Sequence, residues 1–501
     1  MKTIQCPFCQ TPINIDKQAS TVVCLNCCKS FSLGFSVKSE PAAVKPVVPP
    51  APANARYKTA TVRLPRFVDD KEKTEPNDIT PAAPNNPPAK KSGKRAIILL
   101  TGMIILAAAG AAGGIYWFKF NKPTQITHTQ AEQKTPVIST EEQEKLRQGK
   151  IAIENDKKRG VQFSDDGKTL IKVPETFTEY KIPYGVTKIG NKAFYRCLKL
   201  SNIIIPNSVT IIGNLAFYEC GKLTNINIPN SVTTIGDNAF RLCYKLTSIN
   251  IPNGITTIED ETFKACQNLT SINIPNSVTT IGNEVFAGCS KLTNINMPDS
   301  VTTIGNEAFS SCSKLTNINI PNSVTTIGNG AFSFCSELTS ISIPNSITTI
   351  SDEVFAGCSK LTNINIPDSV TTIGNEAFRN CGFTQIYLRN GVTTIGNKAF
   401  EGCQKLTVLT IPNSVINIGD EAFSCCFNLI GIGIPNSVTS IGRQAFSACW
   451  GVKAFNIPNS VINIGNDAFS NCAPSNITLP ERFRGQEERL QIPVTSKVTY
   501  Q

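Results

Sequence analysis

The sequence predicts a repeat solenoid, β-rich and made of short strands with short helical turns, preceded by a small cysteine-rich module and one apolar segment. Two observations carry most of this prediction. A 23-residue period runs through the C-terminal part of the chain, and the segment 96–118 that precedes it contains no charged side chain. A chain of 501 residues is long enough for several such modules.

The distribution of charge separates the two ends of the chain. Lys and Arg number 48 and Asp and Glu 37, which gives a net charge of +11. Residues 1–122 hold 17 basic and 7 acidic side chains, so the rest, with 31 and 30, is nearly neutral. A basic excess at one end indicates contact with a membrane surface or nucleic acid at that end only. His128 is the only histidine, which argues against many enzyme classes, although carboxylate, cysteine or lysine catalysis stays open.

Residues 1–36 contain two Cys-x-x-Cys pairs, at positions 6–9 and 24–27. Each pair can present two thiolates from one tight turn, and two such turns complete the tetrahedral site that zinc prefers. So short a segment cannot bury enough apolar surface to fold alone, so the metal would supply stability. We expect a zinc ribbon with structural zinc. The alternative, a redox dithiol, would use one pair on a thioredoxin-like unit, which the sequence lacks. The expected ligands are Cys6, Cys9, Cys24 and Cys27.

Residues 37–95 are rich in proline, alanine, asparagine and lysine, a composition that favours an extended, disordered linker. Residues 96–118 then run without a charge. As a helix they would span roughly 34 Å, enough to cross a bilayer with some tilt. We therefore expect one transmembrane helix over 96–118, followed by a second linker over 119–138.

The flanks of the apolar segment predict its orientation. Four basic residues lie within 90–95, whereas only Lys119 and Lys122 follow the segment closely. The positive-inside rule then places the N-terminus in the cytosol and the repeats in the periplasm or outside the cell. A reducing cytosol also suits four zinc thiolates. Gly110 and Gly114 form a small-xxx-small pair, which is compatible with a homodimer through this helix.

Cysteine and phenylalanine set the period of the repeats. Cysteines recur with a 23-residue spacing from Cys197 to Cys381, one 22-residue step leads to Cys403, and the longer spacing resumes as far as Cys472. Phenylalanine keeps the same period three positions earlier, which predicts about 13 repeats over residues 183–472. One unit has too few apolar residues for a core of its own, so neighbouring units must stack.

The unit from Leu223 to Cys243 illustrates one expected turn of the solenoid. The Leu-x-x-Ile-x-Ile spacing of residues 223–228 predicts a short strand with one buried face. Proline and asparagine at 229–230 end this strand. A second short apolar segment follows at 232–235, and residues 239–243 are expected to form a short helical turn.

The pattern Leu-x-x-Ile-x-Ile-Pro-x-Ser-Val-Thr-x-Ile-Gly-x-x-Ala-Phe-x-x-Cys closely resembles the BspA-like leucine-rich repeats. Residues 163–183 look like the hairpin and first strand that open such arrays. Members of that family are mostly surface-displayed or secreted and are associated with adhesion to host or matrix proteins and to other cells. The resemblance therefore implies a leucine-rich-repeat fold and a binding function. This chain departs from the usual pattern, because it has an internal membrane anchor and a zinc ribbon in place of an N-terminal signal peptide.

The cysteine ladder invites disulfide or metal hypotheses. Equivalent side chains in a solenoid point the same way, however, and a free cysteine behaves as a small buried hydrophobe. We therefore expect buried thiols throughout the ladder. Cys425, adjacent to Cys426 and outside the period, is the one expected to be exposed.

Asparagine and threonine recur at the outward positions of the first strands. These polar ladders either bind a ligand along the exposed face or satisfy one another and keep the sheet soluble. The shortened repeat has lost its proline, and its one-residue deletion should offset the stack locally; Trp450 and Phe455 make the last repeats irregular as well. The candidate ligand-binding residues are Asn225, Asn227, Asn273, Asn294, Asn296, Tyr387 and Arg389.

Both ends of the array are expected to be capped. Thr140-Glu-Glu-Gln143 predicts a capping box that opens a polar helix, and this helix with the hairpin forms an N-terminal cap over 139–182. Residues 473–501 form the C-terminal cap. Taken together, these sequence features predict a non-enzymatic, single-pass membrane protein whose repeats bind a protein or glycan. The alternative is a membrane-bound regulator whose zinc ribbon contacts a cytosolic partner or nucleic acid, although the ribbon shows no marked basic surface.

Overall fold

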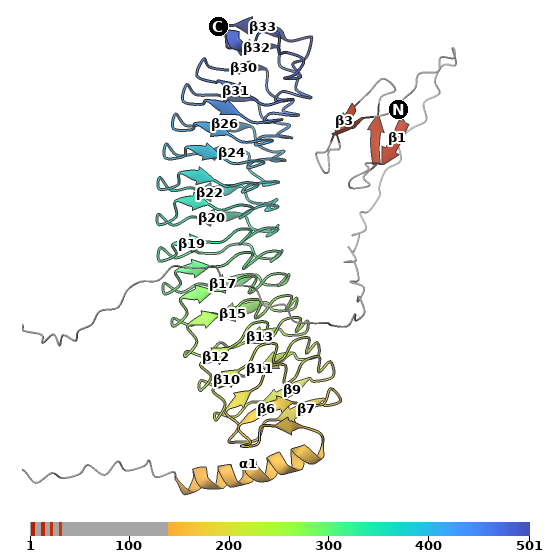
Figure 1. Cartoon of the computed structure of the whole chain (residues 1–501), viewed down its shortest axis with the longest axis vertical. Coiled ribbons are helices and arrows are strands. Elements are labelled where there is room, and N and C mark those ends of the chain that lie inside the picture. The colour runs from red at the N-terminus through yellow and green to blue at the C-terminus, as the bar shows by residue number, and fades with distance from the viewer. Residues whose placement is uncertain (1, 6–11, 16–20, 24–29, 33–138) are drawn as a thin grey trace, which may run out of the picture. The chain divides into compact units, whose positions relative to one another are not determined.

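The computed structural model describes residues 139–501 without a gap and, nearer the N-terminus, residues 2–5, 12–15, 21–23 and 30–32 (Figure 1). In these ranges no helix combines the length and apolarity needed to cross a bilayer. The predicted transmembrane helix over 96–118, both linkers and all four predicted zinc ligands lie outside the described residues.

Two antiparallel strand pairs lie in the N-terminal segment. β1 (Lys2–Gln5) pairs with β2 (Pro12–Ile15), and β3 (Thr21–Val23) pairs with β4 (Ser30–Ser32). In the sequence, one Cys-x-x-Cys pair falls between the strands of each hairpin. The hairpins are therefore compatible with the predicted ribbon, and its metal site stays a prediction.

Helix α1 (Thr140–Lys158) opens the continuously described part, followed by the hairpin of β5 (Gln162–Phe163) and β6 (Thr169–Lys172). The Ser139 hydroxyl accepts a hydrogen bond from the Glu142 backbone N–H at 3.2 Å. The cap is thus one residue earlier than the predicted Thr140. Tyr180 ties the helix to the first turn, since its hydroxyl donates to the Asp156 carboxylate at 2.7 Å.

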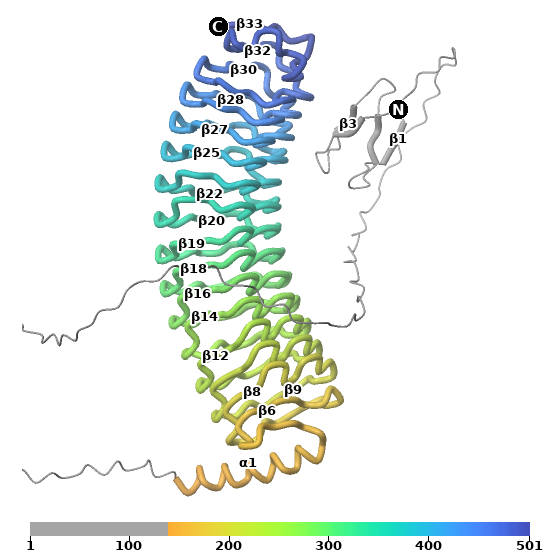
Figure 2. The backbone as a smooth tube through the Cα atoms, viewed as in Figure 1, coloured from red at the N-terminus to blue at the C-terminus, as the bar shows by residue number. Residues whose placement is uncertain are grey.

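The array has about 14 turns, stacked in chain order from α1 to the C-terminus (Figure 2). Nearly every turn contributes a short first strand with a side chain that points inward, and most of these strands pair in parallel with the first strand of at least one adjacent turn. The turn around Asn317 forms only an isolated bridge to Ser340. The first strands are β7 (Glu179–Lys181), β9 (Asn202–Ile204), β11 (Asn225–Ile226), β13 (Ser248–Ile249), β15 (Ser271–Asn273), β17 (Asn294–Asn296), β20 (Ser340–Ser342), β22 (Asn363–Asn365), β24 (Gln385–Tyr387), β26 (Val408–Thr410), β28 (Gly431–Gly433), β30 (Ala454–Asn456), β32 (Asn476–Leu479) and β33 (Lys497–Tyr500).

A second, shorter strand follows in each turn and also pairs in parallel with its neighbours. The 3-10 helix η1 (Glu481–Phe483) lies between β32 and β33 in the predicted C-terminal cap. The second strands are β8 (Lys188–Ile189), β10 (Ile211–Ile212), β12 (Thr234–Ile235), β14 (Thr257–Ile258), β16 (Thr280–Ile281), β18 (Thr303–Ile304), β19 (Thr326–Ile327), β21 (Thr349–Ile350), β23 (Thr372–Ile373), β25 (Thr394–Ile395), β27 (Asn417–Ile418), β29 (Ser440–Ile441) and β31 (Asn463–Ile464).

The interior is a stack of equivalent side chains. Periodic phenylalanine rings from Phe194 to Phe469 stack on one another with centroids 4.8 to 6.0 Å apart. The periodic cysteines carry thiols, not disulfides, and are buried, which confirms the prediction. Cys289, for example, donates from Sγ to the Phe263 carbonyl at 3.2 Å, and burial raises the pKa of its thiol to about 12. Such thiols are held in the unreactive protonated form.

Cys425 contradicts its prediction, because only 1% of it is exposed. The residue has a positive φ of 60°, and its N–H donates to the Ser447 carbonyl of the next turn. Its counterparts one turn away on either side are Gly402 and Ala448, so no large neighbouring side chain competes for the space. The prediction of an exposed Cys425 was wrong because it used only the position of this residue in the sequence, whereas its burial depends on the adjacent turns.

The predicted short helical turn is also wrong. Each such segment contains residues with left-handed backbone angles, as at Asn238 (φ 56°) and Leu242 (φ 63°). Alternate backbone N–H groups therefore donate to carbonyls of the next turn of the solenoid. The Phe240 N–H donates to the Thr262 carbonyl at 2.9 Å, whereas the Ala239 N–H donates to the Gly236 carbonyl of its own turn at 3.3 Å. Hydrogen bonds between turns thus replace those of a helix.

Glycine after the second strand allows neighbouring backbones to approach closely. A Cβ on Gly305 would lie 2.5 Å from the carbonyl carbon and oxygen of Gly282, well inside van der Waals contact. Two turns lack this glycine and carry Glu259 and Ser351 instead. In the described array, these are the two places where the second-strand pairing stops, between β12 and β14 and between β19 and β21. At the second break the Ser351 hydroxyl donates to the Ile327 carbonyl at 2.5 Å.

Candidate functional site: a groove on the first-strand face

The predicted asparagines are exposed at outward positions of the first-strand ladder, as strand alternation requires. Asn273 and Asn296 lie side by side in the register of β15 and β17. All five asparagines belong to turns several rungs from Tyr387, so the structure does not unite the seven candidates in one site. Phe455, which the sequence marked as irregular, is buried in the core.

Tyr387 and Arg389 line one groove with β22 and β24. This groove, termed the Tyr387 groove, has a volume of about 330 Å³. Its walls come from two consecutive first strands and the residues that flank them. The lining residues are Thr362, Asn363, Ile364, Asn365, Ile366, Thr384, Gln385, Ile386, Tyr387 and Arg389.

The groove lies at one of several interruptions in the first-strand ladder. Within residues 139–501, β20 pairs with β22 and β24 pairs with β26, but no strand pairing joins β22 to β24. Ile364 is only half-buried there, whereas the corresponding Ile341 and Ile386 in the adjacent turns are buried. The second strands still pair across this step, through Thr372 and Thr394.

The residue missing from the 22-residue repeat lies just before β24, which forms one wall of the groove. Only Gly382 separates Cys381 from Phe383, whereas both a serine and a lysine separate the matching Cys358 and Leu361. The deletion thus shortens the turn just before β24, and the second strands beyond it keep their register. The ladder is also unpaired at two 23-residue steps, between β9 and β11 and between β28 and β30, so the predicted local offset stays a prediction.

Contacts within the groove fix its two candidate side chains. The Tyr387 ring is 60% exposed, and its hydroxyl donates to Gln385 Oε1 at 3.1 Å. Arg389 Nε donates to the Ile366 carbonyl at 3.2 Å and lies 3.7 Å from Asp368 Oδ1. Arg389 thus replaces the lost proline with a side-chain bridge between the two turns, and its charge is partly offset.

A second groove of about 430 Å³ continues along the same face. It shares Asn363 and Asn365 with the Tyr387 groove, so the two meet at β22. The sequence did not single out Gln385, although it stands two positions before Tyr387 and therefore on the same face of β24. Asn317 belongs to the polar ladder that the sequence indicated, but the sequence did not mark the other outward residues of this second groove, which are Asn319, Ser340 and Ser342.

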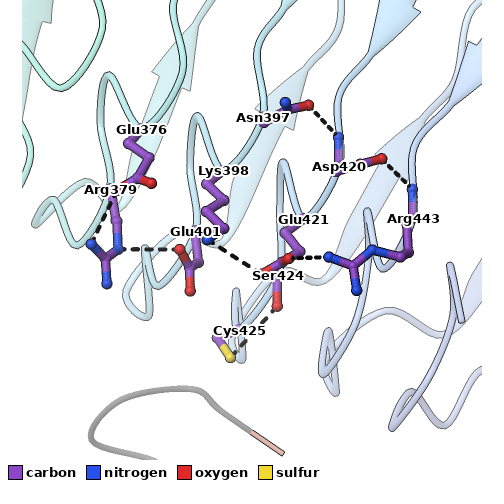
Figure 3. A network of polar contacts seen from close by, with 10 residues as sticks. All are labelled: Glu376, Arg379, Asn397, Lys398, Glu401, Asp420, Glu421, Ser424, Cys425 and Arg443. Carbon is purple, nitrogen blue, oxygen red and sulfur yellow. Dashed lines mark hydrogen bonds and ion pairs between the residues drawn. The ribbon is translucent and has the colours of Figure 1, made fainter.

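A charged network occupies the turn segments of the C-terminal half (Figure 3). Arg379 links Glu376 at 3.0 Å and Glu401 at 3.1 Å, while Glu421 pairs with Arg443 at 3.0 Å. Burial raises the pKa of Glu401, and the nearby Arg379 opposes that effect only in part. The Arg379–Glu401 and Arg443–Glu421 pairs join consecutive turns, so we assign them a role in stacking.

No group of three or more His, Cys, Asp or Glu side chains is arranged to hold a metal ion in the described part of the chain. The chemistry available on the first-strand face is that of amides, hydroxyls, one exposed aromatic ring and one guanidinium. These groups can form hydrogen bonds and stack against a ligand.

Parallel first strands around a periodic interior define a leucine-rich-repeat solenoid. The family described as BspA type Leucine rich repeat region (6 copies) matches residues 174–292, 256–384 and 371–488. The chain belongs to this family of BspA-type leucine-rich-repeat proteins.

The chain is also similar to several solved structures. A leucine-rich repeat protein from Bacteroides ovatus is 28% identical, with 68% of this chain and 93% of that chain covered and a TM-score of 0.50. A leucine rich cell surface protein from Faecalibacterium prausnitzii is 27% identical, with 68% and 92% covered and a TM-score of 0.45. The pneumococcal vaccine antigen PcpA is 20% identical, with 68% and 82% covered and a TM-score of 0.40. No curated protein matches the sequence significantly.

Proposed function

We propose that this chain is a single-pass membrane protein whose repeat array binds a protein or glycan outside the cytosol and so acts in adhesion. The observation that carries the proposal is the Tyr387 groove, where the regular face opens and exposes an aromatic ring beside amides and a guanidinium. Stacked repeats present extended surfaces, and repeat proteins generally use such surfaces for binding.

Adhesion of whole cells tests the binding face. The double variant Tyr387→Glu/Arg389→Glu should weaken adhesion to immobilised collagen, fibronectin or mucin, since it places two acidic groups in the groove. The matched variant Asn225→Glu/Asn227→Glu carries two such changes on and beside β11, and adhesion should decrease less. The opposite ranking would contradict the proposed place of binding.

The membrane anchor is supported by the uncharged run 96–118 and its basic flank. Protease added to intact cells and to spheroplasts tests the topology of the full chain. Cleavage in intact cells supports surface display, and cleavage only in spheroplasts supports a periplasmic array. Protection in both, with cleavage after detergent, would place the array in the cytosol and end the adhesion proposal.

Structural zinc in residues 1–36 is part of the same proposal. Its support is the spacing of Cys6, Cys9, Cys24 and Cys27, each pair being flanked by the strands of one hairpin. Elemental analysis of the purified full chain should give close to one zinc per chain, and a Cys24→Ser variant should lose most of it. A metal-free chain with all four thiols reduced would overturn this part.

The two N-terminal hairpins also favour a second candidate function, a membrane-bound regulator whose ribbon contacts a cytosolic partner or nucleic acid. Deletion of residues 1–36 separates the two functions. Adhesion should survive this deletion if the array is an adhesin. Loss of an intracellular response together with unchanged adhesion would favour the regulator.

A further inference from the structure

The two grooves on the first-strand face form one polar track. The 430 Å³ groove begins at Asn317 and Asn319, passes Ser340 and Ser342, and meets the Tyr387 groove at Asn363 and Asn365. The track crosses four consecutive first-strand positions, which at about 4.8 Å per strand gives a length of roughly 14 Å. Its chemical groups recur once per turn along the stack.

The chemistry of the track excludes several kinds of ligand. Arg389 is the only charged side chain that lines either groove, and its Nε is already bonded to the Ile366 carbonyl. A polyanion or an acidic peptide would therefore meet little positive charge. A protein partner normally needs a cluster of large apolar or aromatic anchors, and Tyr387 is the only aromatic residue among those that line the two grooves.

A neutral saccharide fits these groups. Sugar hydroxyls both donate and accept hydrogen bonds, as do the side chains of Asn363, Asn365 and Gln385. The C–H face of a pyranose ring can pack on an exposed aromatic ring, and the bond from Tyr387 to Gln385 holds that ring in place. The half-buried Ile364 supplies an apolar floor where the ladder is open.

We propose that the track from Asn317 to Arg389 binds an extended, neutral oligosaccharide, with one sugar ring stacked on Tyr387. The proposal rests on the binding function of the array and specifies its ligand class. The spacing of about 4.8 Å between rungs is close to the advance of an extended pyranose chain. Successive rings therefore meet successive pairs of amides or hydroxyls.

Titration calorimetry on the full chain in detergent tests the assignment, with linear β-1,4-linked gluco-, xylo-, manno- and N-acetylglucosamine oligosaccharides from the disaccharide to the hexasaccharide. At least one series should bind saturably, with an affinity that rises with chain length to about the tetrasaccharide, because the track has four rungs. Tyr387→Ala should weaken binding roughly tenfold. Tyr387→Trp should retain binding. The control Ser248→Ala/Ser271→Ala changes exposed serines of β13 and β15 outside both grooves and should match the wild type.

Failure of all four series to bind would overturn the saccharide assignment, as would binding that Tyr387→Ala leaves unchanged. Thermal unfolding of each variant confirms that the fold is intact. The whole-cell adhesion assay separates this outcome from failure of the proposed function. If no oligosaccharide binds but adhesion to collagen or fibronectin still falls with the Tyr387→Glu/Arg389→Glu change, the groove binds protein and only the ligand class is wrong.

Discussion

The inward and outward sides of the same first strands follow different rules. Inside, the first strands present mostly isoleucine, which forms one buried cluster with the periodic leucine, phenylalanine and cysteine side chains outside these strands. Outside, the asparagines of β17 give way to serines on β20, to Gln385 and Tyr387 on β24 and to glycines on β28. Each turn is stabilised mainly by its neighbours, so the periodic interior supports the array while outward residues can vary for binding. Paired variants can test this division of roles.

Two phenylalanines of one turn should show the largest contrast. Phe332 is fully buried in the ring stack, whereas Phe334, two positions later, is 56% exposed. Phe332→Ala should lower the free energy of unfolding by about 3–5 kcal/mol, because it leaves a cavity between two rings. Phe334→Ala should change it by less than about 0.5 kcal/mol. Urea unfolding of the full chain, followed by circular dichroism, measures both, and equal losses would contradict the contrast.

Substitutions of two glycines should differ in their effect on stability, by somewhat less than the two phenylalanine substitutions. A Cβ at Gly305 would meet the backbone of Gly282, whereas a Cβ at Gly431 on β28 would have nothing within 4 Å. Gly305→Ala should destabilise the array by about 1–3 kcal/mol, because neighbouring turns must move apart. Gly431→Ala should leave the unfolding midpoint unchanged or slightly raised. A tolerated Gly305→Ala would show that close backbone approach is not needed there.

Two glutamates should respond oppositely to pH. Burial raises the pKa of Glu401, so its contribution to stability falls as pH rises from its usual pKa through the raised folded value. A hydrogen bond from Lys360 lowers the pKa of the partly exposed Glu337, so the contribution of Glu337 to stability is lost as pH falls through the lowered folded value. The melting temperature, measured from acid to neutral pH, tests both. In the Glu401→Gln variant, the decline of the melting temperature toward neutral pH that Glu401 causes should disappear. Glu337→Gln should instead remove a small loss at acid pH, and identical profiles would refute the assignment.

The smallest effect is expected at the two turns that lack the close-approach glycine. Glu259→Gly should let β14 pair with β12, although glycine itself costs about 0.5–1 kcal/mol of chain entropy, so the net change in the free energy of unfolding should stay below about 1 kcal/mol. Hydrogen exchange is the sensitive measurement, and the amides of residues 256–259 should gain protection while those at the Ser351 break do not change. Unchanged exchange would show that Glu259 does not cause the interruption.

Particular residues mark the limit of sequence-based prediction. The period, the buried thiols and the outward asparagines followed from residue spacing, because each depends on the apolar pattern within one unit. The helical turn and the exposed Cys425 were wrong for a shared reason. In both places the backbone forms hydrogen bonds with a residue one turn away, as from the Cys425 N–H to the Ser447 carbonyl. The pattern of residues within one repeat does not reveal such bonds between turns.

The sequence by itself determined the family, the number of turns to within about one and which side of each strand faces inward. These features are set by periodic apolar residues, whose burial drives the stacking. The tertiary structure alone decided which first strands pair and which polar residues meet in one groove. Gln385, Tyr387 and Asn363 line one groove at the step where β24 does not pair with β22. That outcome depends on the relative position of two stacked turns, which residue spacing within either turn does not specify.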